Sequence, residues 1–586
     1  MSSAQQLARQ GLECAGQGRL EEAARLLAQA ADLEPGNPAP RFNLGLVQQQ
    51  RGLHEDAVRA FDAVLALQPA VAQAHHARGI ALKNLGRHAQ ALASYDEALR
   101  LAPGMFAAHN NRGVVLKHLG RLDEALASYE AALALQPQSA EVHNNAGIVL
   151  HELARYQEAL AAFERSLAQG GETAPVLMNA AVALHQLRRY DEAHAFFARA
   201  LRLAPGDVDV RLNLGNTLAA QERTEEALAA FREVLAARPE DADAMGNLAN
   251  TLRDAGRHAE ALPWYDKAVG LYPGHAGLRW NRSLSLLASG DFARGWQDYE
   301  WRWKAEKLQG GARVLDAPLW LGREPLQGRT LLLHAEQGLG DTLQFCRYAA
   351  LLAQRGAQVV LEVQPPLVPL LAGLAGVARV VARGTPLPPH DFQCPLMSLP
   401  LALGTAPDTI PWDGPYLRAD PALVAHWKGF LAGSRQPQIG LSWSGNPAYW
   451  NDHRRSMTLA GMRAALPEGF GYWQLQKDNA TDAQKDIGPP VQRFAQNDFP
   501  NTAAQICALD AVISVDTSIG HLAGALGRPV FLLLSRPADA RWMEERADSP
   551  WYPSARLIRQ QVAGDWAPVF RELAQALAAL AALPPT

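Results

Sequence analysis

Cysteine is scarce in this chain of 586 residues, and the few cysteines present form no CxxC pair. Cys14, Cys346, Cys394 and Cys507 are scattered, which fits neither a disulfide framework nor a zinc site, so we expect buried, reduced thiols. The N-terminus lacks the apolar core of a signal peptide, and no apolar run is long enough to cross a bilayer. These absences predict a cytoplasmic protein without a membrane span.

An excess of charge of one sign is also lacking. The 55 Lys and Arg residues against 59 Asp and Glu give a net charge of −4, so we expect no nucleic-acid partner. The chain has no complete GxGxxG and no Walker A motif, and its second half has no Asp-x-Asp. No group of His, Asp and Glu has metal-ligand spacing. We therefore expect no cofactor and no metal, while a homo-oligomer stays open.

The first half of the chain repeats every 34 residues. Prolines recur at one position of the period and small residues at another, and each unit carries a second small residue followed four positions later by a large apolar one. The small positions allow two helices to approach closely, and the large residue is expected to fill the groove between units. The prolines fall at Pro35, Pro69, Pro103, Pro137, Pro205, Pro239 and Pro273, and the large residues are Leu27, Phe61, Tyr95, Tyr129, Phe163, Phe197, Phe231 and Tyr265.

This pattern resembles the tetratricopeptide repeat (TPR), a pair of helices per unit. Eight units in one register are followed by a degenerate unit that adds Trp280, Trp296, Trp301 and Trp303. We expect these tryptophans to cap the array against the next domain, and the all-α TPR superhelix to span residues 7–306.

One position of the repeat is asparagine in most units, although asparagine is a mediocre helix former. Its carboxamide could grip the backbone of an extended peptide, or it could hydrogen-bond between repeats. The row is similar to the asparagine ladder of the protein O-GlcNAc transferases, and that resemblance implies peptide binding; Ala77 interrupts it here. The predicted peptide-binding residues are Asn111, Asn145, Asn179, Asn213 and Asn247.

The second half changes to alternating apolar runs and helical segments. After a Pro- and Gly-containing linker (307–328), a strand expected from Thr330 and β-rich runs at 358–363 and 378–383 predict a parallel, buried sheet. A second lobe repeats this arrangement. We expect two Rossmann-like lobes, residues 329–420 and 421–586, with a final helix in 566–583 packed back across them.

The segment 509–534 is the most informative stretch of the second half. An apolar strand, 511–515, ends at Asp516-Thr517-Ser518, where small polar side chains can cap a helix; Gly520 and His521 follow, and then a second strand. A helix N-terminus at the carboxyl end of a parallel strand suits an anion. We interpret it as a phosphate site, the alternative being a capped turn without a ligand.

Other polar groups are expected beside this loop. Ser444 and Asn446 follow the strand at 438–442, and Arg454 and Arg455 come shortly after, where paired guanidinium groups suit a pyrophosphate or form a solvated surface pair. Gln476, at another strand end, is a weaker candidate for the nucleotide pocket.

These motifs resemble the GT-B glycosyltransferases of family 9, the heptosyltransferase group, over roughly residues 328–580. The fragment GLGDTLQF is similar to the family's first-lobe motif, and DTSIGHLAGALGRPV to its second-lobe motif, from which Ile519 departs. The resemblance implies that Asp341 is the catalytic base, the alternative being a helix cap. It implies that Thr517, Ser518 and the backbone at Gly520 hold a nucleotide diphosphate, with Asp516 orienting the loop.

Together the two halves predict a glycosyltransferase that needs no metal. A nucleotide sugar is the donor, a polypeptide recruited by the TPR array is the acceptor, and His521 donates to a phosphate oxygen unless it merely packs in the turn. Two alternatives stay open: a transferase acting on a lipid or oligosaccharide, and a scaffold without activity.

Overall fold

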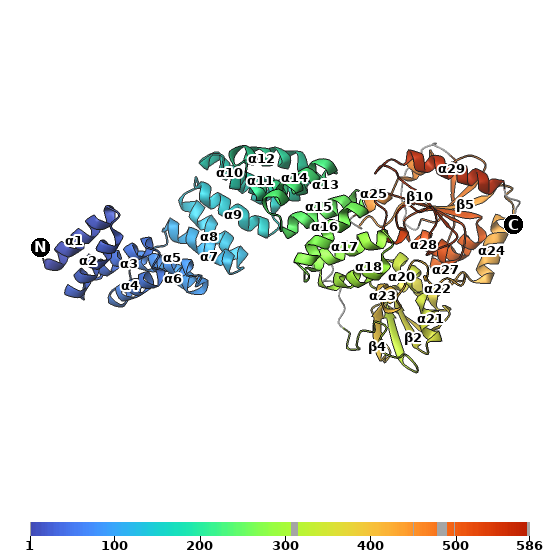
Figure 1. The fold of residues 1–586 in the computed structure, drawn as a ribbon, viewed down its shortest axis with the longest axis horizontal. Helices are drawn as coiled ribbons and strands as arrows, with labels where there is room; N and C mark the ends of the chain where they lie inside the picture. The colour runs from blue at the N-terminus through green and yellow to red at the C-terminus, as the bar shows by residue number, and fades with distance from the viewer. Residues whose placement is uncertain (1, 306–314, 449–450, 477–488, 497, 583–586) are drawn as a thin grey trace. The chain divides into compact units, whose positions relative to one another are not determined.

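A computed structural model describes residues 2–305, 315–448, 451–476, 489–496 and 498–582. The chain divides into two compact units, Met1–Ala237 and Arg238–Thr586. The first holds helices α1 to α14, and the second holds helices α15 to α18 together with two α/β lobes (Figure 1). The predicted linker belongs to the second unit, and its residues 307–314 lie outside the described part.

Consecutive helices pack as pairs throughout the first unit and at the start of the second. The pairs of the first unit are α1 (Ser3–Gly16) with α2 (Leu20–Leu33), α3 (Pro38–Gln50) with α4 (His54–Leu67), α5 (Ala72–Asn84) with α6 (His88–Leu101), α7 (Phe106–His118) with α8 (Leu122–Leu135), α9 (Ala140–Glu152) with α10 (Tyr156–Gly170), α11 (Ala174–Gln186) with α12 (Tyr190–Leu203), and α13 (Val208–Ala220) with α14 (Thr224–Ala237). In the second unit they are α15 (Ala242–Asp254) with α16 (His258–Leu271), and α17 (Ala276–Ala288) with the shorter α18 (Phe292–Tyr299).

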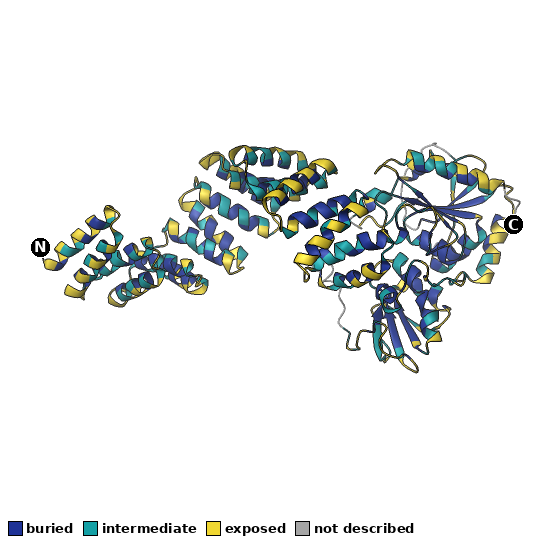
Figure 2. Cartoon of the chain, in the orientation of Figure 1, coloured by how far each residue is buried: buried dark blue, intermediate teal, exposed yellow. Residues whose placement is uncertain are grey.

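In five helical pairs of the first unit, a glycine of the first helix lies against an aromatic ring of the second; these are Gly45, Gly79, Gly113, Gly147 and Gly215. A Cβ on Gly113 of α7 would stand 2.6 Å from the ring of Tyr129 of α8, and the same contact joins Gly45 to Phe61. Tyr129 and Phe61 are buried, as the dark inner faces of the helices in Figure 2 illustrate. The contact lies within a pair, whereas the sequence suggested a groove between units.

The first lobe is a parallel sheet of four strands in the order β3-β2-β1-β4. Its strands are β1 (Thr330–His334), β2 (Gln358–Val363), β3 (Val377–Ala382) and β4 (Phe392–Pro395). Between β1 and β2 run α20 (Leu339–Phe345) and α21 (Tyr348–Gln354); the short helices α22 (Val368–Leu371) and α23 (Leu399–Ala402) follow β2 and β4. The three expected strands are confirmed; β4 was not predicted.

The second lobe is a parallel sheet of six strands in the order β10-β9-β8-β5-β6-β7. The strands are β5 (Gln438–Ser442), β6 (Gly471–Gln474), β7 (Val491–Arg493), β8 (Ala511–Val515), β9 (Val530–Leu534) and β10 (Ala555–Arg559). The helices are α24 (Pro421–Leu431), α25 (Asp452–Arg455), α26 (Leu459–Arg463), α27 (Phe499–Ala508), α28 (Ser518–Ala525) and α29 (Ala567–Ala581). The predicted strand–loop–helix–strand unit is confirmed as β8, α28 and β9.

Apolar burial explains these sheets. Every residue of β5, β8 and β9 is buried, as parallel strands covered on both faces require. Helix α29 packs Leu573 and Leu577 against a core that contains Ile513 of β8 and Ile558 of β10. The final helix therefore covers the sheet of the second lobe. An all-α array followed by an α/β region of two lobes is the predicted fold class, and it is confirmed.

Among the described residues, no helix is both long and apolar enough to cross a membrane.

Replacing Gly113 by valine tests the packing of the repeats. The buried ring of Tyr129 cannot yield without disturbing its neighbours, so we expect Gly113→Val to lower the free energy of unfolding by about 1–3 kcal/mol. Gly104→Val is the matched control, because a Cβ there has nothing within 4 Å; its effect should stay within about 0.5 kcal/mol. Urea unfolding followed by circular dichroism measures both, and equal effects would contradict the proposed role of the glycine.

Candidate active site

A cavity of about 890 Å³ lies inside the second unit. One wall comes from helices α15 to α18, and the other comes mainly from loops of both lobes. Such a concave site with apolar walls and a few convergent polar groups is a typical ligand pocket. Its polar lining residues are Asn250, Arg253, Asp254, His258, Asn281, Gln337, Asn451, Arg455, Asp516, Ser535, Asp539 and Arg541.

The two predicted loops meet beside this cavity. Helix α20 of the first lobe packs on α28 of the second, and a Cβ on Gly340 would stand 2.7 Å from Cδ2 of His521. Only a glycine allows this approach. The N-terminal ends of two short helices therefore face each other across the lobes.

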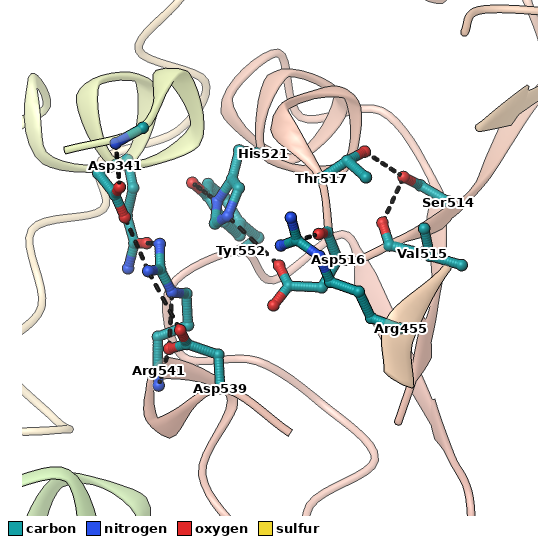
Figure 3. A network of polar contacts seen from close by, with 12 residues as sticks. Asp341, Arg455, Ser514, Val515, Asp516, Thr517, His521, Asp539, Arg541 and Tyr552 are labelled. Carbon is teal, nitrogen blue, oxygen red and sulfur yellow. Dashed lines mark hydrogen bonds and ion pairs between the residues drawn. The ribbon is translucent and has the colours of Figure 1, made fainter. Parts of the chain in front are cut away.

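Asp341 stands at this junction with both carboxylate oxygens engaged (Figure 3). Oδ2 accepts a hydrogen bond of 2.7 Å from the N–H of Gly338, and Oδ1 lies 2.7 Å from Nη2 of Arg541. The first contact is the helix-capping alternative that the sequence left open. The second joins the two lobes.

Arg541 is the site residue that sequence reasoning missed. It lies in the short 3₁₀ helix η4 (Ala540–Trp542), and its Nε and Nη1 donate to Asp539 and Gln344, each at 2.9 Å. Burial lowers the pKa of Arg541, but Asp539, Asp341 and Asp516 outweigh it and raise this pKa above its usual value. A lone arginine in a loop carries no local pattern, and Asp341 is 200 residues away.

Asp516 lines the cavity and is held by His521 and Arg455. Nε2 of His521 lies 3.7 Å from its Oδ1, and Nη1 of Arg455 donates to its backbone carbonyl at 2.8 Å. Burial raises the pKa of Asp516, but the contact with His521 and the charges of Arg541 and Arg455 outweigh it and lower the pKa to about 2. Asp516 is therefore an anion at neutral pH.

His521 supports Asp516 from behind. It is 3% exposed, stacks on Trp542, and has its Nδ1 2.9 Å from the hydroxyl of Tyr552. Burial lowers its pKa, which favours the neutral ring. The sequence suggested that His521 donates to a phosphate unless it packs in the turn. Its Nδ1 has a hydrogen-bond partner in Tyr552, whereas the contact of Nε2 with Asp516, at 3.7 Å, is longer than a hydrogen bond, so donation to a phosphate stays a prediction.

The remaining predicted residues gather at the strand ends of the second lobe. Oε1 of Gln476 accepts from the hydroxyl of Ser442 at 3.2 Å and from the N–H of Ser444 at 3.3 Å. Thr517 is the N-cap residue of α28, but its hydroxyl contacts Ser442 and Ser514 and caps nothing. The expected side-chain cap is therefore missing, and the first turn of α28 lacks a side-chain acceptor at this position.

Four predicted residues stand apart from that network. Gly520 is buried, and a Cβ there would meet Leu532 at 2.5 Å, so packing explains this glycine. Ser518 opens α28 half-buried, Arg454 is half-buried on α25, and Asn446 is exposed. Of the predicted residues of the lobes that the structure describes, Arg455 and Asp516 line the cavity.

The asparagine row hydrogen-bonds between repeats. In the first unit, Nδ2 of Asn145 donates to Asn110 at 3.3 Å and that of Asn179 to Asn144 at 3.2 Å. The other members contact His76 and Lys83 (Asn111) or their own helix (Asn213), and Asn247 lies half-buried on α15. This is the structural alternative that the sequence left open; peptide binding stays a prediction.

The helical wall of the cavity carries its own polar network. Nη1 of Arg253 donates to Oδ1 of Asn281 at 3.0 Å, and the hydroxyl of Tyr265 donates to Asn250 at 2.6 Å. Trp280 lines this wall, and Trp296 packs edge-on against Phe345 of α20. The expected capping of the array by tryptophans therefore holds for Trp296.

A buried arginine ties the end of the array to the loop of Asp341. Arg302, in the 3₁₀ helix η1 (Glu300–Lys304), contacts Glu336 at 2.9 Å, Glu300 at 2.7 Å and the hydroxyl of Ser398 at 2.9 Å. Burial outweighs the attraction of Arg302 and raises the pKa of Glu336 to about 7. Removing one partner of such a pair leaves a buried charge alone. Among the described residues, no group of three or more His, Cys, Asp or Glu side chains is placed to hold a metal ion.

Comparison with known proteins identifies the helical half. Models of the tetratricopeptide repeat match residues 15–79, 72–105, 104–170, 172–240 and 212–276. The helical pairs are tetratricopeptide repeats. Such arrays present extended binding surfaces, which indicates a protein-interaction module.

Among curated proteins, Protein FlbA of Caulobacter vibrioides is 26% identical over 345 residues, which cover 52% of this chain and 55% of FlbA. The chain thus spans about half the length of this relative. Among solved structures, YrrB, described as a TPR protein with an unusual peptide-binding site, is 28% identical over 31% of this chain and 95% of its own, with a TM-score of 0.28. PilF of Pseudomonas aeruginosa is 21% identical over 35% of this chain and 94% of its own, with a TM-score of 0.32.

His258 makes the stability of the cavity wall sensitive to acid. Burial lowers the pKa of His258 to about 4, and the charge of Arg253 adds to the shift. Between about pH 6.5 and pH 4, the unfolded chain therefore binds a proton at this residue and the folded chain does not. Stability is therefore lost as the pH falls from about 6.5 towards 4, by about 2 kcal/mol at pH 5. His258→Gln should shrink the drop in unfolding midpoint between pH 7.5 and pH 5, measured by calorimetry. An unchanged drop would contradict the assignment.

Proposed function

We propose that this protein is a glycosyltransferase that moves a sugar from a nucleotide-activated donor to a side-chain hydroxyl of a polypeptide, without a divalent metal. The observation that carries the proposal is the cavity, because repeat helices and the loops of both lobes converge on it. A nucleotide sugar and an acceptor side chain must occupy one enclosed space for transfer to outcompete hydrolysis.

The chemistry requires a base and a site for the leaving group. Asp341 accepts the proton of the acceptor hydroxyl as its oxygen bonds to the anomeric carbon. The bond from that carbon to the donor phosphate breaks, and its electron pair leaves with the nucleoside diphosphate. Asp341 lies at the junction of the lobes, and the GLGD motif around it resembles that of family 9 enzymes.

The diphosphate site is proposed at the loop before α28. The N-cap residue Thr517 makes no side-chain cap, which leaves the first turn, with Ser518 and Gly520, available to an anion. Arg455 is fixed beside this loop by Asp452 and the Asp516 carbonyl, with Arg454 on the same turn and Ser444 and Gln476 at the neighbouring strand ends. Asp516 and its supporting His521 set the shape of the loop.

The repeats supply the acceptor in this proposal. Joining an interaction module to a catalytic domain in one chain raises the local concentration of a bound polypeptide. A scaffold without activity is the second candidate, favoured by one observation: both carboxylate oxygens of Asp341 have protein partners.

A thermal-shift screen of nucleoside diphosphates and nucleotide sugars tests donor binding. At a concentration of 100 Kd, the matching ligand should add about 2.7 kcal/mol to the stability, because it binds the folded state alone. Nucleosides without phosphate serve as the control. A complete panel without any shift would contradict the transferase and leave the scaffold.

Replacing Asp341 tests the base. Asp341→Asn keeps the size and the hydrogen bond to Gly338 N–H but removes the proton acceptor, so transfer of labelled sugar should fall by about 10²- to 10⁴-fold while donor binding is retained. Label is followed separately in the protein and lipid fractions of an acceptor extract. Full activity of the variant would contradict the assigned base, and label in the lipid fraction alone would contradict the polypeptide acceptor.

A further inference from the structure

Arg541 joins the two lobes through a set of contacts that divides into two kinds. Asp539, two residues before it in the same 3₁₀ segment, accepts from Nε at 2.9 Å and from the backbone N–H of Arg541 at 3.0 Å. The second kind of contact is with α20 of the other lobe. Nη2 of Arg541 lies 2.7 Å from Oδ1 of Asp341 (Figure 3). Nη1 of Arg541 donates to Oε1 of Gln344 at 2.9 Å. The first kind moves with Arg541; the second breaks whenever Arg541 turns away from α20.

Asp341 cannot act as a base in this arrangement without losing a partner. Its Oδ2 bond to the Gly338 N–H belongs to the first turn of α20, so giving it up costs the helix a cap. Its Oδ1 contact is with the side chain of Arg541, which lines the cavity, so it is the one that a competing anion can take over.

We propose that Arg541 is the residue that receives the leaving diphosphate, and that it blocks Asp341 until the donor arrives. This rests on the proposed transferase function. When the diphosphate enters, the guanidinium group of Arg541 turns from Asp341 to the phosphate oxygens. Oδ1 of Asp341 then loses its contact with Arg541 and can accept a proton. In the transfer step, the electron pair of the broken sugar–phosphate bond settles on a phosphate oxygen facing Arg541, and the acceptor proton moves to Oδ1.

Arg541 is better placed for this task than the arginine that the sequence indicated. Arg455 is bound to Asp452 at 3.0 Å and to the carbonyl of Asp516 at 2.8 Å, contacts that shape the loop and would be lost on reorientation. The side chain of Arg541 lines the cavity and is 15% exposed, so a ligand can reach it. Its planar, permanently charged fork matches two phosphate oxygens at once.

The exchange has a thermodynamic consequence. A diphosphate can bind Arg541 only after the Asp341–Arg541 pair has broken. The paired state does not bind, so its population reduces the observed affinity for a diphosphate. Removing the charge of Asp341 should therefore tighten diphosphate binding while it abolishes transfer. The extra affinity exists only if Arg541 is present to use it, which defines a double-mutant cycle.

The experiment measures the Kd of inorganic pyrophosphate by isothermal titration calorimetry for the full-length protein and for Asp341→Asn, Arg541→Gln and the double variant. We expect Arg541→Gln to weaken binding about 10- to 100-fold, the range of a lost charge-assisted contact. Asp341→Asn should tighten it about 5- to 10-fold in the wild-type background and at most about 2-fold in the Arg541→Gln background. Arg541→Lys, which keeps the charge but not the fork, should fall between wild type and Arg541→Gln.

Asp254→Asn is the control for general electrostatics. It removes one negative charge from the same cavity, and the Asp254 carboxylate pairs with Nη2 of Arg253 at 2.8 Å. Its effect on the Kd should be about 2-fold or less, as expected of a charge without direct contact. A gain as large as that of Asp341→Asn would overturn the proposal.

A purely structural role for Arg541 makes a different prediction. If Arg541 only fastens the lobes, Arg541→Gln lowers the unfolding midpoint and leaves the pyrophosphate Kd of the folded protein unchanged, which would overturn the proposal. Additive effects in the cycle would do the same. Either result leaves the transferase function standing if the wild type turns over a nucleotide sugar. A wild type that binds neither pyrophosphate nor any nucleoside diphosphate would instead overturn the proposed function itself.

Discussion

The close approach of two helix N-termini, one from each lobe, is the contact on which the candidate site depends. Gly340 of α20 lies against His521 of α28, and any side chain at Gly340 would force the lobes apart. Each N-terminus carries a partial positive charge, so their meeting is unfavourable unless anions lie between or beside them. Asp341 and Asp516 stand at these two ends. The carboxylates are thus part of what allows the lobes to close on each other.

Closing the lobes buries these carboxylates, and buried charges need partners. Asp516 is held by His521 and by the field of two arginines, which keeps it ionised. Asp341 is held by Arg541 and by its own helix. Arg541 already contacts the carboxylate of Asp341, and His521 that of Asp516. An anion that enters the site and binds either residue must therefore replace a carboxylate as its partner. Ligand binding at such a site is coupled to a rearrangement of side chains.

Local pattern predicted the elements of this molecule well. The 34-residue period defined the helical pairs, because each unit packs a small residue of one helix against a large side chain of the next, as in Gly113 and Tyr129. The run at 511–515, apolar except for Ser514, predicted β8 with the bounds that it has in the structure. The short strands β4 and β7 were not predicted. They have four and three residues and lie at the edges of their sheets, where a strand needs few apolar side chains.

The site itself was only partly predictable. Asp341 and Asp516 belong to the glycine-containing motifs GLGD and DTSIG, and the structure places both residues at the junction of the lobes. Arg541 and Arg253 lie on no motif, and their importance comes from partners brought near by the fold: Asp341 for Arg541, and Asn281 of a neighbouring helical pair for Arg253. His521 was found by its motif, but its surroundings were not predictable, because the fold alone brings Tyr552 and Asp516 beside its ring.

The last helical pairs belong physically to the site and do not merely precede it. Arg302 buries its charge against Glu336, three residues before the start of α20, and Gln337 donates to the hydroxyl of Tyr299 of α18 at 3.1 Å. A buried pair of this kind contributes little net stability but opposes any displacement of its members, because separation leaves a charge without a partner. The loop that carries Asp341 is therefore fixed from the side of the repeats. Asn250 of α15 and Asn281 of α17 line the cavity and belong to the polar groups that the repeats contribute to it. In the proposed function, these groups would lie beside the acceptor.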